Sequence, residues 1–573
     1  MHDVLAPRGP DGEGLWFADD GRVALSHRRL SIIDLSEGGA QPMASADESL
    51  RITYNGEIYN YRELRDGLIA DGVSFRSDSD TEVLLHLYAR MGPEMVRALR
   101  GMFAFAIRDE EKGSLFLARD PYGIKPLYIA DDGKTVSVAS QVRALLAGGG
   151  IDTEPDAAGH AGFFLFGSVP EPHTLYRGIE ALPAGCTVWI DEEGRAPVRR
   201  YFDISQELAD AAAAPFDRDA LHTALRDTVC HHLIADVEVG VFLSSGLDSA
   251  TLVALASEQA AALRTVTLGF DAFRGTPDDE VPLAEQIAAQ YGTAHETRRI
   301  DGETFREEAD ALFAAMDQPS IDGVNTYFVS KATKEAGLKV AISGLGGDEL
   351  FGGYEDFIQI PKLVGMMRPF RGLPWLGRAF RTVSAPIAGM MTSPKAAGLI
   401  EYGTGYGDAF LLRRALFMPW ELPRVMDPSV ARDGLEMLDI RTRLCDTAAS
   451  ARSPRARLTA LESSWYMRNQ LLRDADWASM AHSLEIRVPL VDVALLRAAA
   501  PMINGPTPPT KADMASSPAH SLPDAVLHRR KTGFSVPVRD WLGTGKDKPV
   551  ERGLRGWART VYGQVWTGPD LMA

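Results

Sequence analysis

Residues 237–249, VEVGVFLSSGLDS, decide the fold of the C-terminal half of the chain. The mostly apolar run Val237–Leu243 predicts a buried strand, and the polar run Ser244–Ser249 leads into a helical stretch that begins at Asp248. A strand-to-helix loop rich in Ser and Gly aims backbone N–H groups at one point, and the helix N-terminus adds positive potential there. The stretch therefore predicts a phosphate-binding loop at the carboxyl end of a strand.

Strands and helices continue to alternate on the C-terminal side of this loop. A second apolar run spans Arg264–Phe270, a helix is expected from Glu280, and a third apolar run spans Leu338–Ser343. Such alternation is typical of a parallel sheet covered on both faces, which binds ligands at the carboxyl ends of its strands. We therefore predict an α/β fold with a doubly wound parallel sheet, followed from about Pro361 by a mostly helical part.

The N-terminal half consists of short alternating segments separated by turns, from Ser26 to about Asp191. This pattern predicts antiparallel sheet layered with a few helices. The clearest strands are Gly101–Asp109 and Ser114–Arg119, and the helical runs are Tyr61–Ile69 and Thr81–Met91. The stretch QELADAAAAPFD has little apolar patterning and predicts a linker. We therefore expect a first domain over residues 1–205, a linker over 206–217 and a second domain over 218–573.

The composition narrows the class of protein. A formal net charge of -18 and a pI near 5.2 would repel phosphate backbones and anionic lipids, so neither a nucleic acid nor a membrane is expected as a partner. The first residues lack the basic and apolar regions of a secretory signal, and we expect a cytoplasmic protein. Cys186, Cys230 and Cys445 contain no C-x-x-C pair, which argues against a disulfide framework and a zinc site.

A second acidic, glycine-rich loop, Ser343–Glu349, follows the third apolar run. The first loop alone fits a serine-rich helix N-cap equally well, but two such loops at two strand ends favour a nucleotide site. Asp248 would repel phosphate unless it holds Mg²⁺, which is usually bound by one or two carboxylates plus substrate phosphates. A dinucleotide fingerprint is excluded because Glu349 stands where its third glycine belongs, and no Walker A sequence occurs.

Together with Asp476–Ala481 (DWASMA) and Leu484–Pro489 (LEIRVP), these loops resemble the asparagine synthetase family, whose synthetase domain is an ATP pyrophosphatase. The family's version of the first loop reads S-G-G-L-D-S, and this chain departs from it only at Ser245, which replaces a glycine. The resemblance implies Mg²⁺ ligation by Asp248 and Asp348. It also implies ATP contacts from Leu243, Ser244, Gly246, Asp248, Ser249, Leu268, Ser343 and Gly344.

The segment Leu527–Pro537 (LHRRKTGFSVP) resembles the family's basic stretch. This implies that Lys531 offsets negative charge developing on the α-phosphate and is catalytic together with Asp248 and Asp348. Arg529 and Arg530 fit a solvated basic turn. Leu345 departs from the family, because asparagine-forming members carry a glutamate there, and this departure favours a different acceptor carboxylate.

Three strings near the N-terminus, RGPDG (8–12), HRRLSIID (27–34) and YNGEIYN (54–60), resemble the class II glutamine amidotransferase domain, which has a layered αββα fold of the Ntn type. The resemblance implies that Arg29 binds the glutamine carboxylate and that Asn55, Gly56, Glu57 and Asp80 contact its amide and amine. The family's nucleophile is a cysteine after the initiator Met. His2 stands there, so we expect a chain truncated relative to its family, with a natural enzyme that has lost its glutaminase activity as the alternative.

The resemblance implies an ATP-dependent, AMP-forming ligase that converts aspartate to asparagine through an acyl-adenylate, with ammonia from glutamine or from free ammonium. One alternative is the same chemistry on another small carboxylate in a secondary pathway. A second alternative, from a different class, is a non-catalytic sensor of nucleotides and amino acids, which the retention of Asp248, Asp348 and Lys531 disfavours. A homodimer is compatible with the sequence.

Overall fold

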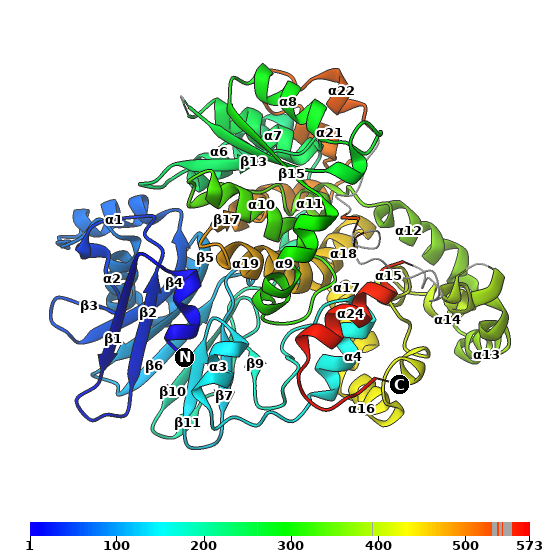
Figure 1. The fold of residues 1–573 in the computed structure, drawn as a ribbon, viewed down its shortest axis with the longest axis horizontal. Helices are drawn as coiled ribbons and strands as arrows, with labels where there is room; N and C mark the ends of the chain where they lie inside the picture. The colour runs from blue at the N-terminus through cyan, green and yellow to red at the C-terminus, as the bar shows by residue number, and fades with distance from the viewer. Residues whose placement is uncertain (261, 392, 530–535, 538–540, 542–552, 573) are drawn as a thin grey trace.

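A computed structural model describes residues 1–260, 262–391, 393–529, 536–537, 541 and 553–572. Figure 1 shows an N-terminal half built mainly of strands, in blue and cyan, beside a C-terminal half in which helices surround a sheet. Cys186, Cys230 and Cys445 are free thiols. Within the described ranges, no helix combines the length and the apolar character needed to cross a bilayer.

Three antiparallel sheets form the N-terminal half. The largest has the order β11-β10-β6-β5-β4-β3, with β12 beside β10, and the smaller ones are β1-β2 and β8-β7-β9. The predicted pairing of β5 with β6 is confirmed, with Ala104 opposite Arg119. The strands are β1 (Gly12–Phe17), β2 (Ala24–Arg29), β3 (Met43–Ala44), β4 (Leu50–Ile58), β5 (Gly101–Asp109), β6 (Ser114–Arg119), β7 (Tyr128–Asp131), β8 (Val136–Ala139), β9 (Glu180–Ala181), β10 (Cys186–Asp191), β11 (Gly194–Arg195) and β12 (Arg199–Arg200).

Contacts between apolar side chains hold the sheets and helices of the N-terminal half together in four layers. One face of the largest sheet packs on two helices, with Leu84 against the cluster of Phe105. Its other face packs on the β7 sheet through Leu117 and Ile129, and the far side of that sheet packs on a third helix through Leu145. These helices are α1 (Tyr61–Ala70), α2 (Asp80–Met91) and α3 (Val142–Gly148). The layer order is therefore helix, sheet, sheet, helix, which confirms the predicted αββα architecture.

A five-stranded parallel sheet forms the centre of the C-terminal half, in the order β15-β14-β13-β16-β17. Every neighbouring pair is parallel, as the apolar, β-branched strands predicted. The strands are β13 (Val239–Phe242), β14 (Arg264–Phe270), β15 (Ala294–Ile300), β16 (Val340–Ile342) and β17 (Glu485–Arg487).

Helices cover both faces of this sheet. Leu252 and Ile287 pack in one cluster with Val241, whereas Phe305 and Phe328 pack in another with β14. The helices concerned are α6 (Arg218–His232), α7 (Leu247–Ser257), α8 (Val281–Gln290), α9 (Gly302–Ala315) and α10 (Val324–Glu335). The doubly wound arrangement is therefore confirmed.

The remainder of the chain is mostly helical, as predicted, and contains one π-helix, η8 (Glu462–Leu472). The α-helices are α11 (Gly347–Phe351), α12 (Asp356–Met367), α13 (Pro374–Met391), α14 (Leu399–Tyr402), α15 (Tyr406–Arg414), α16 (Pro428–Leu438), α17 (Ile440–Ala449), α18 (Pro454–Leu461), α19 (Arg473–Met480), α20 (Val493–Ile503), α21 (Lys511–Ala515), α22 (Asp524–Leu527) and α24 (Arg555–Val565).

The structure differs from the sequence prediction in the stretch assigned to a linker, 206–217. Helix α5 (Ile204–Asp210) covers its first part, with the Asp203 carboxylate accepting the N–H groups of Ser205 and Gln206 at the helix start. Leu208 in this helix is fully buried. Buried Ile204 and Leu208 together with an N-cap thus stabilise a short helix whose alanine-rich surroundings carry no periodic signal. The domain boundaries themselves stay a prediction.

Buried charges join the two halves. Arg8 donates to both carboxylate oxygens of Asp476, at 2.7 and 2.9 Å. Arg487 on β17 is fully buried and lies 3.0 Å from Glu485 and 3.3 Å from Glu57 of the N-terminal half. Because a buried charge is stable only when it is paired, these contacts fix how β4 and β17 lie against each other.

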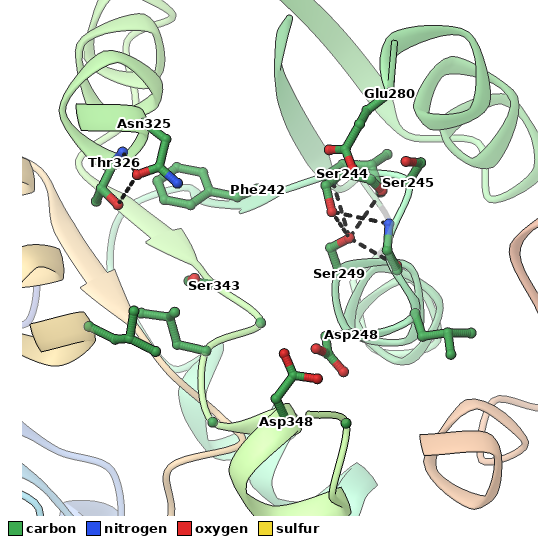
Figure 2. A pocket seen from close by; sticks show the side chains of 18 of the residues that line it. Phe242, Ser244, Ser245, Asp248, Ser249, Glu280, Asn325, Thr326, Ser343 and Asp348 are labelled. Atoms are coloured by element: carbon green, nitrogen blue, oxygen red, sulfur yellow. Dashed lines mark hydrogen bonds between the residues drawn. The ribbon is translucent and has the colours of Figure 1, made fainter. Parts of the chain in front are cut away.

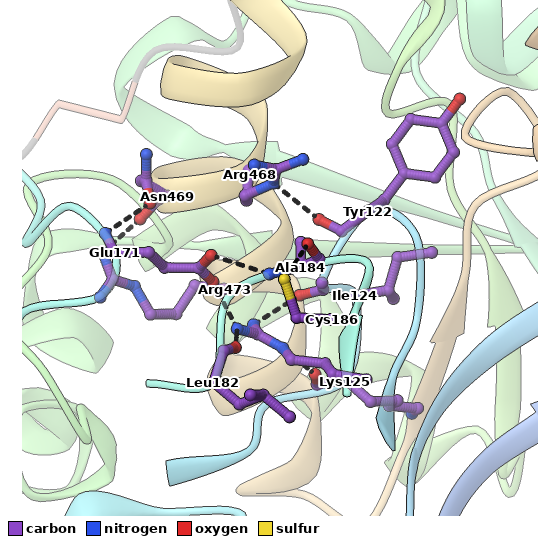
Figure 3. A network of polar contacts seen from close by, with 12 residues as sticks. Tyr122, Ile124, Lys125, Glu171, Leu182, Ala184, Cys186, Arg468, Asn469 and Arg473 are labelled. Carbon is purple, nitrogen blue, oxygen red and sulfur yellow. Dashed lines mark hydrogen bonds and ion pairs between the residues drawn. The ribbon is translucent and has the colours of Figure 1, made fainter. Parts of the chain in front are cut away.

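A second polar network, shown in Figure 3, links the π-helix to the N-terminal half. Arg468 donates to the carbonyl of Tyr122 at 3.2 Å, and the side-chain oxygen of Asn469 accepts the N–H of Glu171 at 3.0 Å. The Glu171 carboxylate pairs with Arg119 at 2.5 Å. The π-helix therefore contacts the N-terminal half while others of its residues line a cavity described below.

Candidate active site

A cavity of about 590 Å³ lies at the carboxyl ends of β13 and β16. We call it the strand-end cavity. All of the residues predicted to bind ATP line it, and so do both predicted metal ligands: Leu243, Ser244, Gly246, Asp248, Ser249, Leu268, Ser343, Gly344 and Asp348. Leu345, the departure from the family pattern, lines it as well. Two loops, Ser244–Ser249 and Ser343–Glu349, therefore meet in this cavity although almost a hundred residues separate them in the sequence. This is expected for loops that follow adjacent parallel strands.

Hydroxyl groups shape the first loop. Ser249 Oγ accepts the N–H of Ser244 at 3.1 Å and donates to the carbonyl of Ser244 at 3.0 Å. The N–H of Gly246 donates to Ser244 Oγ at 3.1 Å. These contacts curl the loop over the N-terminus of α7, where the helix end adds positive potential. The arrangement suits a phosphate group.

The two acids, Asp248 and Asp348, point toward one another across the cavity (Figure 2). Lys511 on α21 lies between them, since its ammonium contacts Asp248 Oδ1 and is 3.0 Å from Asp348 Oδ1. Burial alone would lower the pKa of Lys511, but the two carboxylates outweigh it and its pKa is raised. The three side chains thus form a charge cluster in which one cation faces two carboxylates.

The residues present fit a bound Mg²⁺. Glycines bring the acids close to the backbone: a Cβ at Gly347 would lie 2.6 Å from Asp248 Oδ1, and one at Gly353 would lie 1.9 Å from Asp348 Oδ1. Two converging carboxylates are the usual protein share of a magnesium site that a substrate triphosphate completes. No group of three or more His, Cys, Asp or Glu that would hold a metal without such a substrate occurs among the described residues.

Sequence reasoning missed Lys511 and misjudged Arg529. Lys511 follows Thr510, whose side chain forms a capping box with Asp513, and this helix start is the one local signal for its position. Arg529 was expected in a solvated turn, but its side chain is 18% exposed, lines the strand-end cavity and pairs with Glu280 at 3.6 Å. The pairing with Glu280, the residue before α8, holds the Arg529 side chain at the cavity wall. Lys531 and Arg530 lie outside the described residues.

A second cavity, of about 630 Å³, lies in the N-terminal half and we call it the N-terminal cavity. All five residues predicted to bind glutamine line it: Arg29, Asn55, Gly56, Glu57 and Asp80. Met480 and Glu485 from the C-terminal half also line it, so the cavity reaches the junction between the halves.

The strand β4 supplies the polar floor of this cavity. The amide nitrogen of Asn55 is buried and has no hydrogen-bond partner among the described residues, so it is available to a ligand. Gly56 has φ +153°, and a Cβ there would lie 2.1 Å from the carbonyl oxygen of Met102. Only glycine allows β4 to approach β5 this closely. Arg29 donates to the backbone carbonyls of Ser36, at 2.9 Å, and Asp34.

Two buried acids, Glu57 and Asp80, line the N-terminal cavity. Asp80 accepts the hydroxyl of Tyr54 at 2.9 Å and the N–H of Ile58 at 3.1 Å. Burial outweighs these hydrogen bonds and raises the pKa of Asp80 from 3.8 to about 6. Burial likewise raises the pKa of Glu57 well above its usual range, although Arg487 opposes the shift. A bound ammonium group would compensate both acids.

Two family models match the chain. A glutamine amidotransferase domain matches residues 1–202, and asparagine synthase matches residues 220–559. The first covers the N-terminal cavity and the second covers the strand-end cavity.

Full-length relatives agree with these models. Asparagine synthetase [glutamine-hydrolyzing] 1 of Bacillus subtilis (strain 168) is 33% identical, over 99% of this chain and 87% of that protein. A putative asparagine synthetase [glutamine-hydrolyzing] of Mycobacterium tuberculosis (strain ATCC 25618 / H37Rv) is 34% identical, over 99% of this chain and 86% of that protein. Asparagine synthetase B of Escherichia coli (strain K12) is 33% identical over 62% of this chain and 61% of that protein. With a glutamine amidotransferase domain before its synthetase domain, the chain belongs to the asparagine synthase family.

Proposed function

We propose that the chain makes asparagine from aspartate. ATP would activate the side-chain carboxylate as an acyl-adenylate with release of pyrophosphate, and ammonia from glutamine or free ammonium would then displace AMP. The observation that carries this proposal is the meeting of Asp248, Asp348 and Lys511 beside the Ser244–Ser249 loop in one cavity. Two of the relatives are named as asparagine synthetases, which supports aspartate as the acceptor.

Each residue of the strand-end cavity has a part in this scheme. The Ser244–Ser249 loop and the start of α7 would bind phosphate oxygens through N–H groups and hydroxyls. Asp248 and Asp348 would hold Mg²⁺, which when bound would neutralise phosphate charge and favour departure of pyrophosphate. Lys531, outside the described residues, remains our proposed cation at the α-phosphate.

The N-terminal cavity would bind glutamine, and release of its ammonia would need the cysteine that the family carries where His2 stands. Asn55 and the backbone N–H of Gly56 would form an oxyanion hole for the amide carbonyl. Glu57 and Asp80 would bind the ammonium of glutamine, and Arg29 would bind its carboxylate. Arg29 donates to backbone carbonyls in this structure. When glutamine binds, its carboxylate would therefore replace these acceptors or accept from Arg29 beside them.

The proposal is tested by product analysis with ATP, aspartate and ammonium chloride, the nitrogen source that needs no nucleophile in the N-terminal cavity. We expect AMP, pyrophosphate and asparagine in equal amounts. Formation of ADP and phosphate would contradict adenylation, and the absence of asparagine despite AMP release would contradict the acceptor.

Replacement of Lys511 by Met should lower the rate of pyrophosphate release about a hundredfold. The two carboxylates would lose the cation that holds them together, and the phosphates would lose a positive neighbour. The measurement is pyrophosphate release at saturating ATP. Lys511→Arg, which keeps the charge, is the matched control and should retain far more activity. If Lys511→Met releases pyrophosphate as fast as the parent, Lys511 only balances the charge of the two carboxylates when no nucleotide is bound.

Glutamine binding should weaken as the pH falls through the raised pKa of Asp80, about 6. Below this pKa the carboxyl is neutral and no longer attracts an ammonium, so the loss occurs on the acid side. Calorimetric titration with glutamine at several pH values measures the effect. Asp80→Asn should bind glutamine weakly at all of them. An Asn variant that keeps the parent's pH dependence would show that a different group titrates.

A further inference from the structure

Residues 357–400, which we call the basic segment, carry a charge opposite in sign to that of the whole chain. The segment contains six Lys or Arg residues and no Asp or Glu, whereas the chain has a formal net charge of -18. It spans nearly all of α12, the short helix η5 (Arg368–Phe370), α13 and the short helix η6 (Pro394–Gly398). In Figure 1, α12 and α13 lie at the edge of the molecule away from the N-terminal strands. None of its described residues lines the strand-end cavity or the N-terminal cavity.

Large apolar side chains of the basic segment are exposed to solvent. They are Ile358, Met366, Leu373, Trp375, Phe380 and Val383. Trp375 is 65% exposed and Val383 is 75% exposed, so most of each side chain lies in water. Exposed apolar side chains gathered on one element mark an interaction surface, because covering them is favourable.

Helical spacing places the apolar side chains of α13 on its outward face. Trp375 and Val383 are separated by about two turns of the helix, and they therefore share a face. The inward face contains Gly377, where a Cβ would lie 2.7 Å from the Cα of Glu401 on α14. Because α13 packs on α14 through this glycine, its tryptophan and valine are left without a covering element.

Exposed cations lie among these apolar side chains. Lys362 stands between Ile358 and Met366 at a spacing of one turn on either side, so the three share a face of α12. Arg378 follows Trp375 by one turn on α13. Both cations are exposed, and over the described ranges no carboxylate pairs with either of them.

Two further cations, Arg368 and Arg371, are exposed in the turn between α12 and α13. They too have no acidic partner in the part of the chain that the structure describes. Arg381 differs, because it pairs with Glu401 at 2.6 Å and lies over the ring of Trp420, 5.1 Å from its centroid. Arg381 thus anchors α13 to the rest of the protein, whereas the other cations remain available to an anionic surface.

This combination fits a lipid surface better than it fits other large anions. Helices with Trp and aliphatic side chains on one face and Lys or Arg beside them lie in the interface of anionic membranes. Aliphatic side chains such as Ile358 and Val383 gain nothing from stacking on nucleic-acid bases. In a symmetric dimer, a second copy of the chain would bring the same cations face to face, and like charges repel. The net charge argues against a membrane only as an average over the surface, and the basic segment is a local exception.

We propose that the exposed faces of α12 and α13 bind the surface of a membrane that contains anionic lipids. Trp375 and Val383 enter the boundary between the headgroups and the acyl chains, and Lys362, Arg371 and Arg378 contact lipid phosphates. The helices lie along the membrane surface and do not cross it. Since this contact lies outside both cavities, it does not depend on the proposed function.

Flotation of the full chain with lipid vesicles tests the proposal. The parent should float with vesicles of phosphatidylserine and phosphatidylcholine in equal parts but not with pure phosphatidylcholine, and added salt should weaken the binding. Arg371→Gln combined with Arg378→Gln should weaken binding about twentyfold, because each cation near an anionic surface contributes about fivefold. Trp375→Ser combined with Val383→Ser should weaken it about tenfold or more, because apolar burial at the interface is lost.

Two matched variants control for the loss of any exposed side chain. Arg218→Gln changes an exposed arginine at the start of α6, and Met437→Ser changes an exposed apolar residue on α16. Both should bind the vesicles as the parent does. Thermal unfolding of all four variants should match the parent, because the changed side chains face solvent.

The proposal is overturned if the parent does not float, if it binds neutral and anionic vesicles equally, or if the double variants bind as the parent does. Other occupants of this surface give distinct results. Dimerisation in sedimentation experiments that Trp375→Ser with Val383→Ser abolishes, without vesicle binding, would identify a second copy of the chain. Retention on poly-glutamate without vesicle binding would identify an acidic polypeptide. Either result overturns the membrane assignment.

Discussion

Asp248→Asn and Asp348→Asn, made separately, should each reduce pyrophosphate release to about one hundredth of the parent rate or less. Both side chains end in the strand-end cavity and face the same cation, Lys511. An amide keeps the size of the carboxylate but cannot supply the negative charge that a divalent cation needs from its ligand. Phosphate charge in the cavity would then remain uncompensated during bond breaking.

The measurement is the initial rate of pyrophosphate release at saturating ATP and Mg²⁺, beside thermal unfolding of each variant. Asp278→Asn, an exposed aspartate before α8, is the matched control and should behave as the parent. If either active-site variant keeps the parent rate, the assignment of that acid to the metal is wrong. A loss of rate together with a loss of the folded state would point to structure instead of chemistry.

Replacement of Arg487 by Met should lower the free energy of unfolding by about 3–5 kcal/mol, which is the usual cost of removing one partner from a buried ion pair. Arg487 is fully buried and faces Glu57 and Glu485. Its guanidinium also donates to the carbonyl of His232 at 3.0 Å. The variant leaves two buried acids with only Lys125, which is 3.4 Å from Glu485.

Urea-induced unfolding of parent and variants measures this loss. Arg497→Met removes the same side chain from a surface pair with Glu207, 55% exposed on the arginine side, and should cost less than about 1 kcal/mol. Adding Glu57→Gln to Arg487→Met should recover part of the stability, because one uncompensated acid disappears. Equal stability of Arg487→Met and Arg497→Met would contradict the view that this buried cluster joins the halves.

The parts of the site that were predicted correctly can be recognised from a few consecutive residues in the sequence. Ser244–Ser249 combines a strand end, a glycine and a helix start, so both its conformation and its place at the sheet edge follow from local rules. The same holds for Ser343–Glu349. Asn55 and Gly56 are predicted from the resemblance of YNGEIYN to the amidotransferase family, and the structure places them in one cavity with Glu57 and Asp80.

The parts that the sequence did not predict depend on contacts between distant segments. Lys511 meets Asp248 across 263 residues, and the helix start at Thr510, the one local signal beside it, does not reveal this contact. The strand β17 has three residues, two of them charged, and it is stable at the sheet edge because Arg487 pairs with Glu485 and Glu57.

The fate of the acceptor's carboxylate oxygen tests the central claim most directly. Aspartate labelled with heavy oxygen in its side-chain carboxylate is incubated with the protein, ATP, Mg²⁺ and ammonium chloride, and the nucleotide product is analysed by mass spectrometry. An acyl-adenylate passes one carboxylate oxygen to the phosphate, so we predict AMP that carries one labelled oxygen for each asparagine formed. Label in inorganic phosphate with formation of ADP, or unlabelled AMP beside asparagine, would contradict the account.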